Sequence, residues 1–153
     1  MGRLRRAGPD GRDHWARLPI WARWVLAGYI GGFTDGTAAH VRDLAGRGLH
    51  AYSSFHQPPF QVFFVGLVVL DPLAVILAAL ARPAAAWLGA AVMAADMTAN
   101  WVGNWPWPSH YLMLWPITGF GVFVLATAPA LHRQLRAACL RTPLSPAGQA
   151  RTR

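Results

Sequence analysis

The sequence contains no lysine and no glutamate, and only 13% of its 153 residues are charged. A soluble domain of this size carries about 25% charged residues, so most of this surface is not adapted to water. The hydrophobic share is 54%, and the eight tryptophans lie mostly near the ends of apolar runs, where a bilayer favours amphipathic rings. These features indicate a membrane protein that interacts with the lipid bilayer.

Cysteine is also scarce, since Cys139 is the only one. A single thiol excludes an intrachain disulfide and any zinc or iron–sulfur site built from thiolates. No nucleophile elbow, phosphate loop or zinc-protease motif is present, so we expect no cofactor, and any catalysis would use acids and bases. The net charge of +8 comes from 14 arginines gathered mainly in the tails, a pattern that argues against nucleic-acid binding.

Four apolar segments are predicted to be membrane-spanning helices, at residues 20–41, 59–81, 84–104 and 110–131. The first would be about 33 Å long at 1.5 Å per residue, enough to cross a ~30 Å hydrocarbon core. The fold class expected is all-α, an antiparallel four-transmembrane-helix bundle.

Two short features refine this prediction. Asp71-Pro72 interrupts the second segment and predicts a kink, because proline removes a helical hydrogen bond. Arg82-Pro83 makes the next turn so short that the second and third helices must be antiparallel neighbours. The bundle would occupy residues 19–132, between a flexible basic tail at 1–18 and an arginine-rich tail at 133–153.

The arginine distribution predicts the orientation. Twelve of the 14 arginines lie in the tails, at the start of the first span, or in the turn between the second and third spans; only Arg42 and Arg47 lie on the other side. Because cytoplasmic loops are rich in arginine, we expect both termini to be cytoplasmic in a cell membrane. A signal peptide is the alternative for the first segment, since residues 37–39 loosely resemble a cleavage site, although Asp35 just upstream argues against it.

Three of the six aspartates lie inside separate predicted spans, at Asp35, Asp71 and Asp96. A central aspartate costs roughly 2.5–3.5 kcal/mol on insertion scales. Helical rise places Asp71 and Asp96 each about 18 Å from one end of their spans, near the midplane, with Asn100 one turn outward from Asp96. Simple packing needs only one or two polar ties between helices, so we expect these groups to converge on one pocket in the outer half.

Asp35, Asp71 and Asp96 are the candidate catalytic residues, because a buried carboxyl that keeps its proton can donate it to an apolar substrate. The candidate ligand-binding residues are Asn100, His40 and Trp101.

The histidines His40, His56 and His110 all map to the outer boundary. A metal site made of these three is conceivable, but histidine is common at a membrane interface, and we predict no metal. A bis-histidine haem is excluded because no span has a central histidine.

Glycines recur every four residues on one face of the first span, at Gly28, Gly32 and Gly36. Such a stripe of small residues allows another helix to approach closely. The neighbour could be a helix of the same chain, a second copy or a partner membrane protein.

The layout resembles the EXPERA superfamily, which includes the emopamil-binding proteins and sterol isomerases. The resemblance is carried by Asp35 in GGFTDG, by Pro58-Pro59 in FHQPPF and by Asp71 in VVLDP, and it covers about residues 20–132. The family often has glutamate where this chain has aspartate. The resemblance implies a four-helix core with a cavity for a sterol-like or cationic amphiphilic ligand, faced by Asp35 and Asp71.

Three functions stay open at this point. The first is an intramembrane protein that binds or isomerises a small hydrophobic or sterol-like ligand. The second is a proton- or cation-coupled transporter subunit, in which the same aspartates relay charge. The third is an accessory or assembly protein that binds other helices through the glycine face. The apolar inner half argues against the second function.

Overall fold

The computed structural model describes residues 15–106 and 111–140, and all regular elements in these two stretches are helical. The elements are α2 (Ile20–Arg47), the 3-10 helix η1 (Gly48–Tyr52), α3 (Pro58–Ala79), α4 (Ala84–Gly103) and α5 (Tyr111–Leu140). The predicted all-α fold class is confirmed for this part of the chain.

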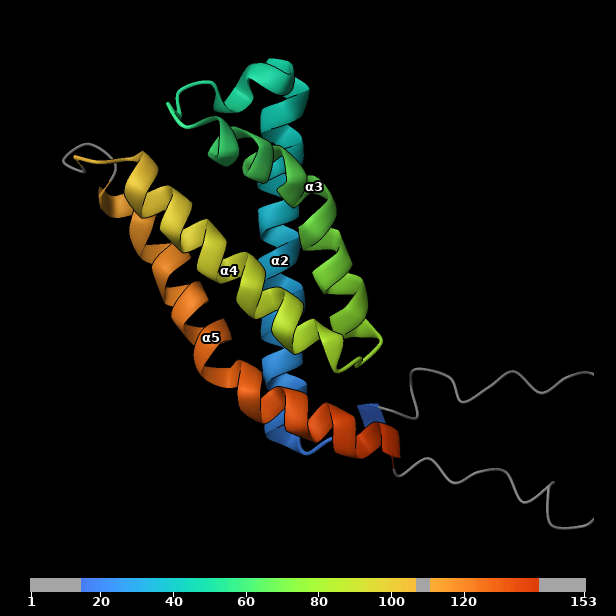
Figure 1. The fold of residues 1–153 in the computed structure, drawn as a ribbon. Helices are drawn as coiled ribbons and strands as arrows, with labels where there is room; N and C mark the ends of the chain where they lie inside the picture. The colour runs from blue at the N-terminus through green and yellow to red at the C-terminus, as the bar shows by residue number, and fades with distance from the viewer. Residues whose placement is uncertain (1–14, 107–110, 141–153) are drawn as a thin grey trace, which may run out of the picture.

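The four long helices form two packed pairs. α2 packs mainly against α3, and α4 mainly against α5. A short turn joins α3 to α4, and the two helices diverge away from that turn (Figure 1). Backbone hydrogen bonds close the turn, with the Arg82 N–H donating to the Leu77 carbonyl oxygen at 2.9 Å.

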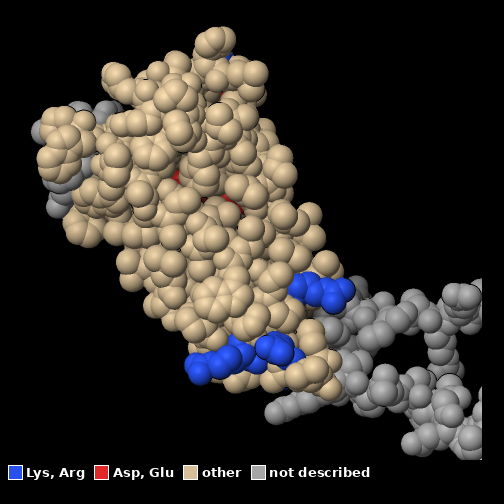
Figure 2. All heavy atoms as spheres, viewed as in Figure 1, with Lys and Arg blue, Asp and Glu red and all other residues tan. Residues whose placement is uncertain are grey.

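The two ends of the bundle differ in charge. Arginine side chains gather at the end that holds the α3–α4 turn, and Figure 2 shows them there in blue. We call it the arginine end; the described arginines at it are Arg17, Arg23, Arg82, Arg133 and Arg136. The opposite end carries η1, and we call it the η1 end.

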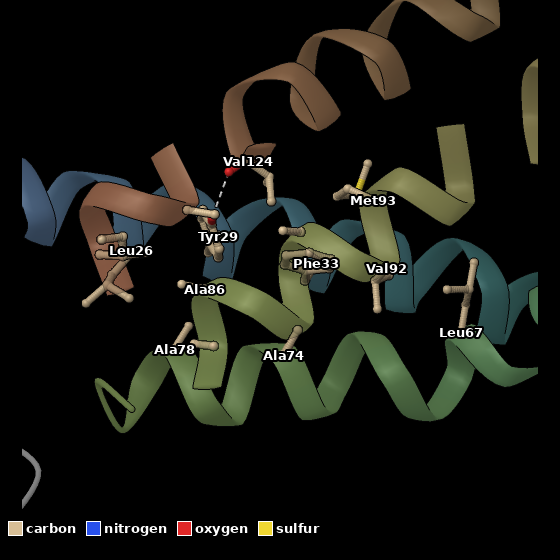
Figure 3. Packing of buried hydrophobic residues seen from close by; sticks show 14 of the residues in the cluster. Leu26, Tyr29, Phe33, Leu67, Ala74, Ala78, Ala86, Val92, Met93 and Val124 are labelled. Atoms are coloured by element: carbon tan, nitrogen blue, oxygen red, sulfur yellow. Dashed lines mark hydrogen bonds between the residues drawn. The ribbon is translucent and has the colours of Figure 1, made fainter. Parts of the chain in front are cut away.

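Aromatic and very small side chains fill the core toward the arginine end (Figure 3). Tyr29 and Phe33 of α2 are fully buried, and the Tyr29 hydroxyl donates a hydrogen bond to the Val124 carbonyl oxygen of α5 at 3.0 Å. A Cβ added at Gly89 of α4 would lie 2.9 Å from the Tyr29 ring and 3.2 Å from the Phe33 ring. The absence of a side chain there lets α4 pack directly on these rings.

The glycine stripe of α2 is covered within the chain. The Phe123 ring of α5 lies 3.0 Å from where a Cβ on Gly28 would be, and the Phe120 ring occupies the equivalent space at Gly32. Gly36, the third member, faces the Asp71 carboxyl of α3. Gly32 therefore does lie against another helix, and that helix belongs to the same chain.

Some boundaries differ from those expected. α2 continues to Arg47 instead of ending at residue 41, because Asp43 and Arg47 pair one turn apart at 3.0 Å. Gly48, with a φ of 61°, ends the helix in a conformation that glycine adopts easily. α5 continues to Leu140, so the first part of the expected C-terminal tail is helical.

The end of the expected N-terminal tail is also ordered by packing. The Trp15 indole N–H donates to the Ala79 carbonyl oxygen at 2.7 Å, and Leu18 is buried. The last residues of the expected 1–18 tail are thus packed against the bundle, with Trp15 bonded to the end of α3.

Two of the described helices are long and apolar enough to cross a membrane: Pro58–Ala79, which is α3, and the stretch Leu114–Leu140 of α5. α3 contains Pro72 and is visibly bent in Figure 1. α2 and α4 are less apolar: α2 carries two aspartates and three arginines, and α4 carries Asp96, Thr98 and Asn100.

Candidate functional site

A cavity of ≈ 580 Å³ lies among all four long helices on the η1 side of the core. Its size is that of a small-molecule site. Most of its wall is apolar, contributed by Phe33, Phe64, Val92, Met93, Leu114, Ile117 and Phe120. The three aspartates Asp35, Asp71 and Asp96 all line it, each from a different helix. Figure 2 shows acidic atoms recessed in an otherwise uncharged stretch of surface.

Asp71 is the most buried of the three carboxyls, with its side chain 6% exposed. It packs onto the backbone of α2 at Gly36, where a Cβ would lie only 2.7 Å from its Oδ2 atom. One turn further along α2, the His40 Nε2 atom is 3.9 Å from the same oxygen. The third glycine of the stripe therefore serves to admit a carboxyl group between two helices.

Asp96 is held by its own helix. The Asn100 side-chain amide donates to the Asp96 Oδ1 atom and to its carbonyl oxygen, both at 3.0 Å. The Asn104 amide donates in turn to the Asn100 carbonyl oxygen at 2.8 Å. These bonds orient the Asp96 carboxyl in the cavity wall. Asp35, by contrast, is exposed, and it lines the same cavity from α2.

A polar network lines the η1 end of the cavity. The His40 Nδ1 atom and the Tyr52 hydroxyl are 2.7 Å apart, and the Tyr52 hydroxyl donates to the Asp43 Oδ2 atom at 3.4 Å. Asp43 also accepts a bond from Arg47 at 3.0 Å. Burial, and then the negative charge of Asp43, raise the pKa of Tyr52 to about 12, so its hydroxyl keeps its proton at neutral pH.

Aromatic stacking holds η1 over the cavity. The Tyr52 and Phe64 rings are stacked with centroids 5.2 Å apart, and the Phe55 ring stacks on Phe64 at 4.6 Å. Phe55 also fills the space beside Gly103, which ties the segment after η1 to the end of α4. The short connection between α2 and α3 is thus part of the site.

Five of the six candidate residues from the sequence line this one cavity: Asp35, Asp71, Asp96, Asn100 and His40. Trp101 does not, because it lies between α4 and α5, where its indole N–H donates to the Thr118 hydroxyl at 2.9 Å. The catalytic and ligand-binding roles assigned to these residues stay predictions.

Sequence reasoning missed five polar residues of the lining: Asp43, Arg47, Tyr52, Ser54 and Asn104. The first four lie between the predicted spans 20–41 and 59–81, where we expected a connecting loop. The spacing of Gly36, His40, Asp43 and Arg47 was an available signal, because intervals of three and four residues put side chains on one helix face.

A metal site is not formed by the described residues. Among residues 15–106 and 111–140, no three histidine, cysteine or acidic side chains cluster closely enough to hold a metal ion. His56 is exposed in the segment before α3, and His110 lies outside the described residues.

In comparisons with known proteins, no family model, no curated protein and no solved structure matches this chain. The EXPERA resemblance therefore stays an expectation based on short motifs. The functional argument depends on the geometry of the cavity.

Proposed function

We propose that the chain is a four-span membrane protein. The main support is the outer surface of the bundle, where every long helix carries exposed large apolar side chains such as Val62, Val69, Leu112 and Val122. A surface of this kind is unfavourable in water and favourable in lipid. Tryptophans form a belt at each end, with Trp21, Trp24 and Trp87 toward the arginine end and Trp105 and Trp115 toward the η1 end.

The arginine end is then the cytoplasmic end, with both termini on that side. Cysteine accessibility tests this topology in a Cys139→Ala background with single cysteines at His50 or Ser145. A membrane-impermeant maleimide added to intact cells should label the His50→Cys variant only. Labelling of both variants from the same side contradicts an even number of spans.

For the cavity, we propose that it binds a small hydrophobic or sterol-like molecule bearing one polar or cationic group, and that it either holds or isomerises this ligand. The observation that carries the proposal is the convergence of carboxyls from α2, α3 and α4 on a single apolar-walled cavity of ≈ 580 Å³. Carboxyls in such surroundings are costly unless they meet polar partners. His40 and Asn100 already lie beside Asp71 and Asp96, and a ligand with a polar group would supply a further partner.

The side chains suggest a division of roles. The exposed carboxyl of Asp35 is placed to receive the polar or cationic group of an arriving ligand. Asp71 and Asp96 lie deeper, where a protonated carboxyl can donate a hydrogen bond or a proton to an otherwise apolar molecule. The phenylalanines of the wall cover its hydrocarbon part.

The alternative functions have less support. A transport path has to continue to the arginine end, but there Tyr29, Phe33 and Gly89 pack directly together. An accessory role would need the glycine stripe to be open to another protein. Phe123, Phe120 and Asp71 of the same chain already cover it.

Ligand-induced stabilisation tests the binding proposal. The purified protein in lipid nanodiscs is heated with two probes, the neutral sterol dehydroergosterol and the lipophilic amine N,N-dimethyldodecylamine. A probe at 100 times its Kd adds about 2.7 kcal/mol to the free energy of unfolding, which is readily seen as a rise in Tm.

The variants Asp35→Asn, Asp71→Asn and Asp96→Asn keep side-chain shape and remove the acid. At least two of them should lose the Tm shift, whereas Asp13→Asn, in the N-terminal segment before the described residues, should keep it. Equal shifts in all four variants contradict binding at the cavity. A shift with the amine alone identifies charge pairing as the basis of recognition.

A further inference from the structure

The polar groups at the η1 end lead from a buried carboxyl toward solvent, an arrangement that ligand binding alone does not explain. It begins at the deepest carboxyl of the cavity and passes His40, Tyr52 and Asp43 in turn. Side-chain exposure rises along α2 toward the η1 end, from 16% at His40 to 40% at Asp43 and 62% at Arg47, against 6% at Asp71. The chain of groups therefore connects a buried acid to an acid in contact with solvent.

We propose that His40 and Tyr52 form a proton-transfer path between Asp71 in the cavity and Asp43 at the surface of the η1 end. Every member of the path can both gain and lose a hydrogen-bonded proton, which is the requirement for relay transfer. The inference uses the cavity of the proposed function but needs no ligand, so each can fail without the other.

The two neutral tautomers of His40 give the path its two end states. When the Tyr52 hydroxyl donates to Asp43, its oxygen accepts from the His40 Nδ1–H, and Nε2 is left with a free lone pair toward Asp71. That arrangement fits a protonated Asp71. When the hydroxyl donates to His40 Nδ1 instead, Nε2 carries the proton and donates toward an ionised Asp71.

One transfer moves a single proton outward. The Asp71 carboxyl gives its proton to His40 Nε2, His40 releases its Nδ1 proton to the Tyr52 oxygen, and Tyr52 passes its original hydroxyl proton to the Asp43 carboxylate. Asp71 ends ionised and Asp43 protonated, while Tyr52 and His40 end neutral. Asp43 then releases the proton to water outside. Rotation of the Tyr52 hydroxyl and exchange of the His40 ring protons restore the first hydrogen-bond arrangement, and Asp71 takes up its next proton from water or a ligand in the cavity.

The distances support each transfer. The contact of 2.7 Å between His40 Nδ1 and the Tyr52 hydroxyl is short and the 3.4 Å contact of Tyr52 with Asp43 is long but within hydrogen-bond reach. The gap of 3.9 Å between His40 Nε2 and Asp71 Oδ2 closes by a small rotation of either side chain or through one bridging water.

The other titratable groups of the cavity do not take the place of Asp71 and Tyr52 beside His40. From α2 itself the cavity receives Asp35, Asp43 and Arg47, and from α4 it receives Asp96, which is bonded to Asn100. α5 contributes only apolar lining among its described residues there. Asp71 and Tyr52 are thus the titratable groups that contact the two ring nitrogens of His40.

A pH jump followed by time-resolved infrared spectroscopy tests the path without any ligand. The protein in nanodiscs is shifted from about pH 5 to about pH 9, a range in which buried carboxyls titrate, and the carbonyl stretch of protonated Asp71 is followed. Asp71→Asn identifies the band by removing it; if this variant fails to fold, Asp71→Glu identifies the band by moving it.

Tyr52→Phe keeps the ring stacked on Phe64 and removes only the hydroxyl. It should slow the loss of the Asp71 band by about tenfold or more, with the same final amplitude. His40→Phe should slow it similarly. Tyr29→Phe, which removes a buried hydroxyl far from the path, should leave the rate unchanged.

Two results overturn the proposal. An unchanged rate in Tyr52→Phe and His40→Phe means that cavity water exchanges protons with Asp71 directly. An Asp71 band that does not respond to external pH in the wild-type protein means that no path reaches this carboxyl. Neither result bears on ligand binding, which the Tm shifts measure separately.

Discussion

The two halves of the bundle use the same four helices but place very different groups between them. Toward the arginine end, Tyr29 and Phe33 fill the centre, and α4 approaches them through Gly89 and its run of alanines. Toward the η1 end, aspartates from three helices line a cavity of ≈ 580 Å³. One half is closed by packing, and the other is held open around polar groups.

The difference follows from what each kind of side chain requires. Alanine and glycine let helix backbones come close, and aromatic rings then fill the remaining space with a large apolar area. Carboxyls lose hydration when they are packed tightly, so they are stable only beside water, a hydrogen-bond partner or a ligand. We therefore expect the filled half to supply most of the stability of the bundle and the hollow half to carry the proposed binding function.

The largest expected effect is on the junction between the two halves, at Gly32. The Phe120 ring of α5 occupies the space where a Cβ would be, so Gly32→Leu has to displace that ring. We expect a loss of about 3 kcal/mol in the free energy of unfolding, at the upper end for overpacked cores. Thermal unfolding in detergent measures it.

The neighbouring residue provides a matched control. A Cβ at Gly31 meets nothing within 4 Å, so Gly31→Leu adds the same side chain on the outside of α2 and should change stability little. Similar losses in both variants contradict the packing of α5 on this face of α2.

The next effect compares one hydroxyl in the filled half with one carboxyl in the hollow half. Tyr29→Phe leaves the Val124 carbonyl oxygen without its 3.0 Å hydrogen bond and should lower the free energy of unfolding by about 1–2 kcal/mol. Asp71→Asn, at a site that favours a neutral group, should lower it less. Thermal unfolding measures the free energy of unfolding of both variants. A larger decrease for Asp71→Asn than for Tyr29→Phe contradicts the idea that the filled half supplies the stability.

A third effect separates function from stability at Gly36. Gly36→Ala puts a methyl group 2.7 Å from the present position of Asp71 Oδ2 and should push the carboxyl away from α2. Probe affinity at the cavity should fall about tenfold, which is 1.4 kcal/mol, while alanine improves helix propensity and limits the loss of stability. Gly46→Ala, on the same helix with nothing within 4 Å, should keep full affinity. Equal affinities in the two variants show that the position of Asp71 does not matter for binding.

The sequence predicted the filled half less well than the hollow half. Aspartates inside apolar segments are conspicuous, so helical rise together with the cost of burying carboxyls led to the expectation that Asp35, Asp71 and Asp96 share one pocket. The interlock of Tyr29 with Gly89 could not be predicted, because it depends on which faces of α2 and α4 meet. Apolar side chains occur on every side of these two helices, so their sequences do not indicate which faces pack together.

The remaining differences arise where local and tertiary preferences compete. Residues 42–47 contain three charged side chains and were expected to be a loop, yet α2 continues through them by more than one turn, with Asp43 and Arg47 paired. This extension carries Asp43 and Arg47 to the mouth of the cavity. Tyr52 reaches the same place only because its ring stacks on Phe64, a contact that no sequence interval shows.

The smallest expected effect concerns pH and the mouth of the hollow half. Burial and Asp43 raise the pKa of Tyr52 from 10.0 to about 12, so the folded state favours the protonated hydroxyl. The stability that this group contributes is complete below about pH 10 and is lost as the pH rises toward about 12. The free energy of unfolding should therefore fall more steeply over this range in the wild-type protein than in Tyr52→Phe. The difference should be on the order of 1 kcal/mol, because water and salt near the cavity mouth screen the charge of Asp43. Identical pH profiles for the two proteins show that Tyr52 is not buried against Asp43 and that the hollow half is open to solvent at η1.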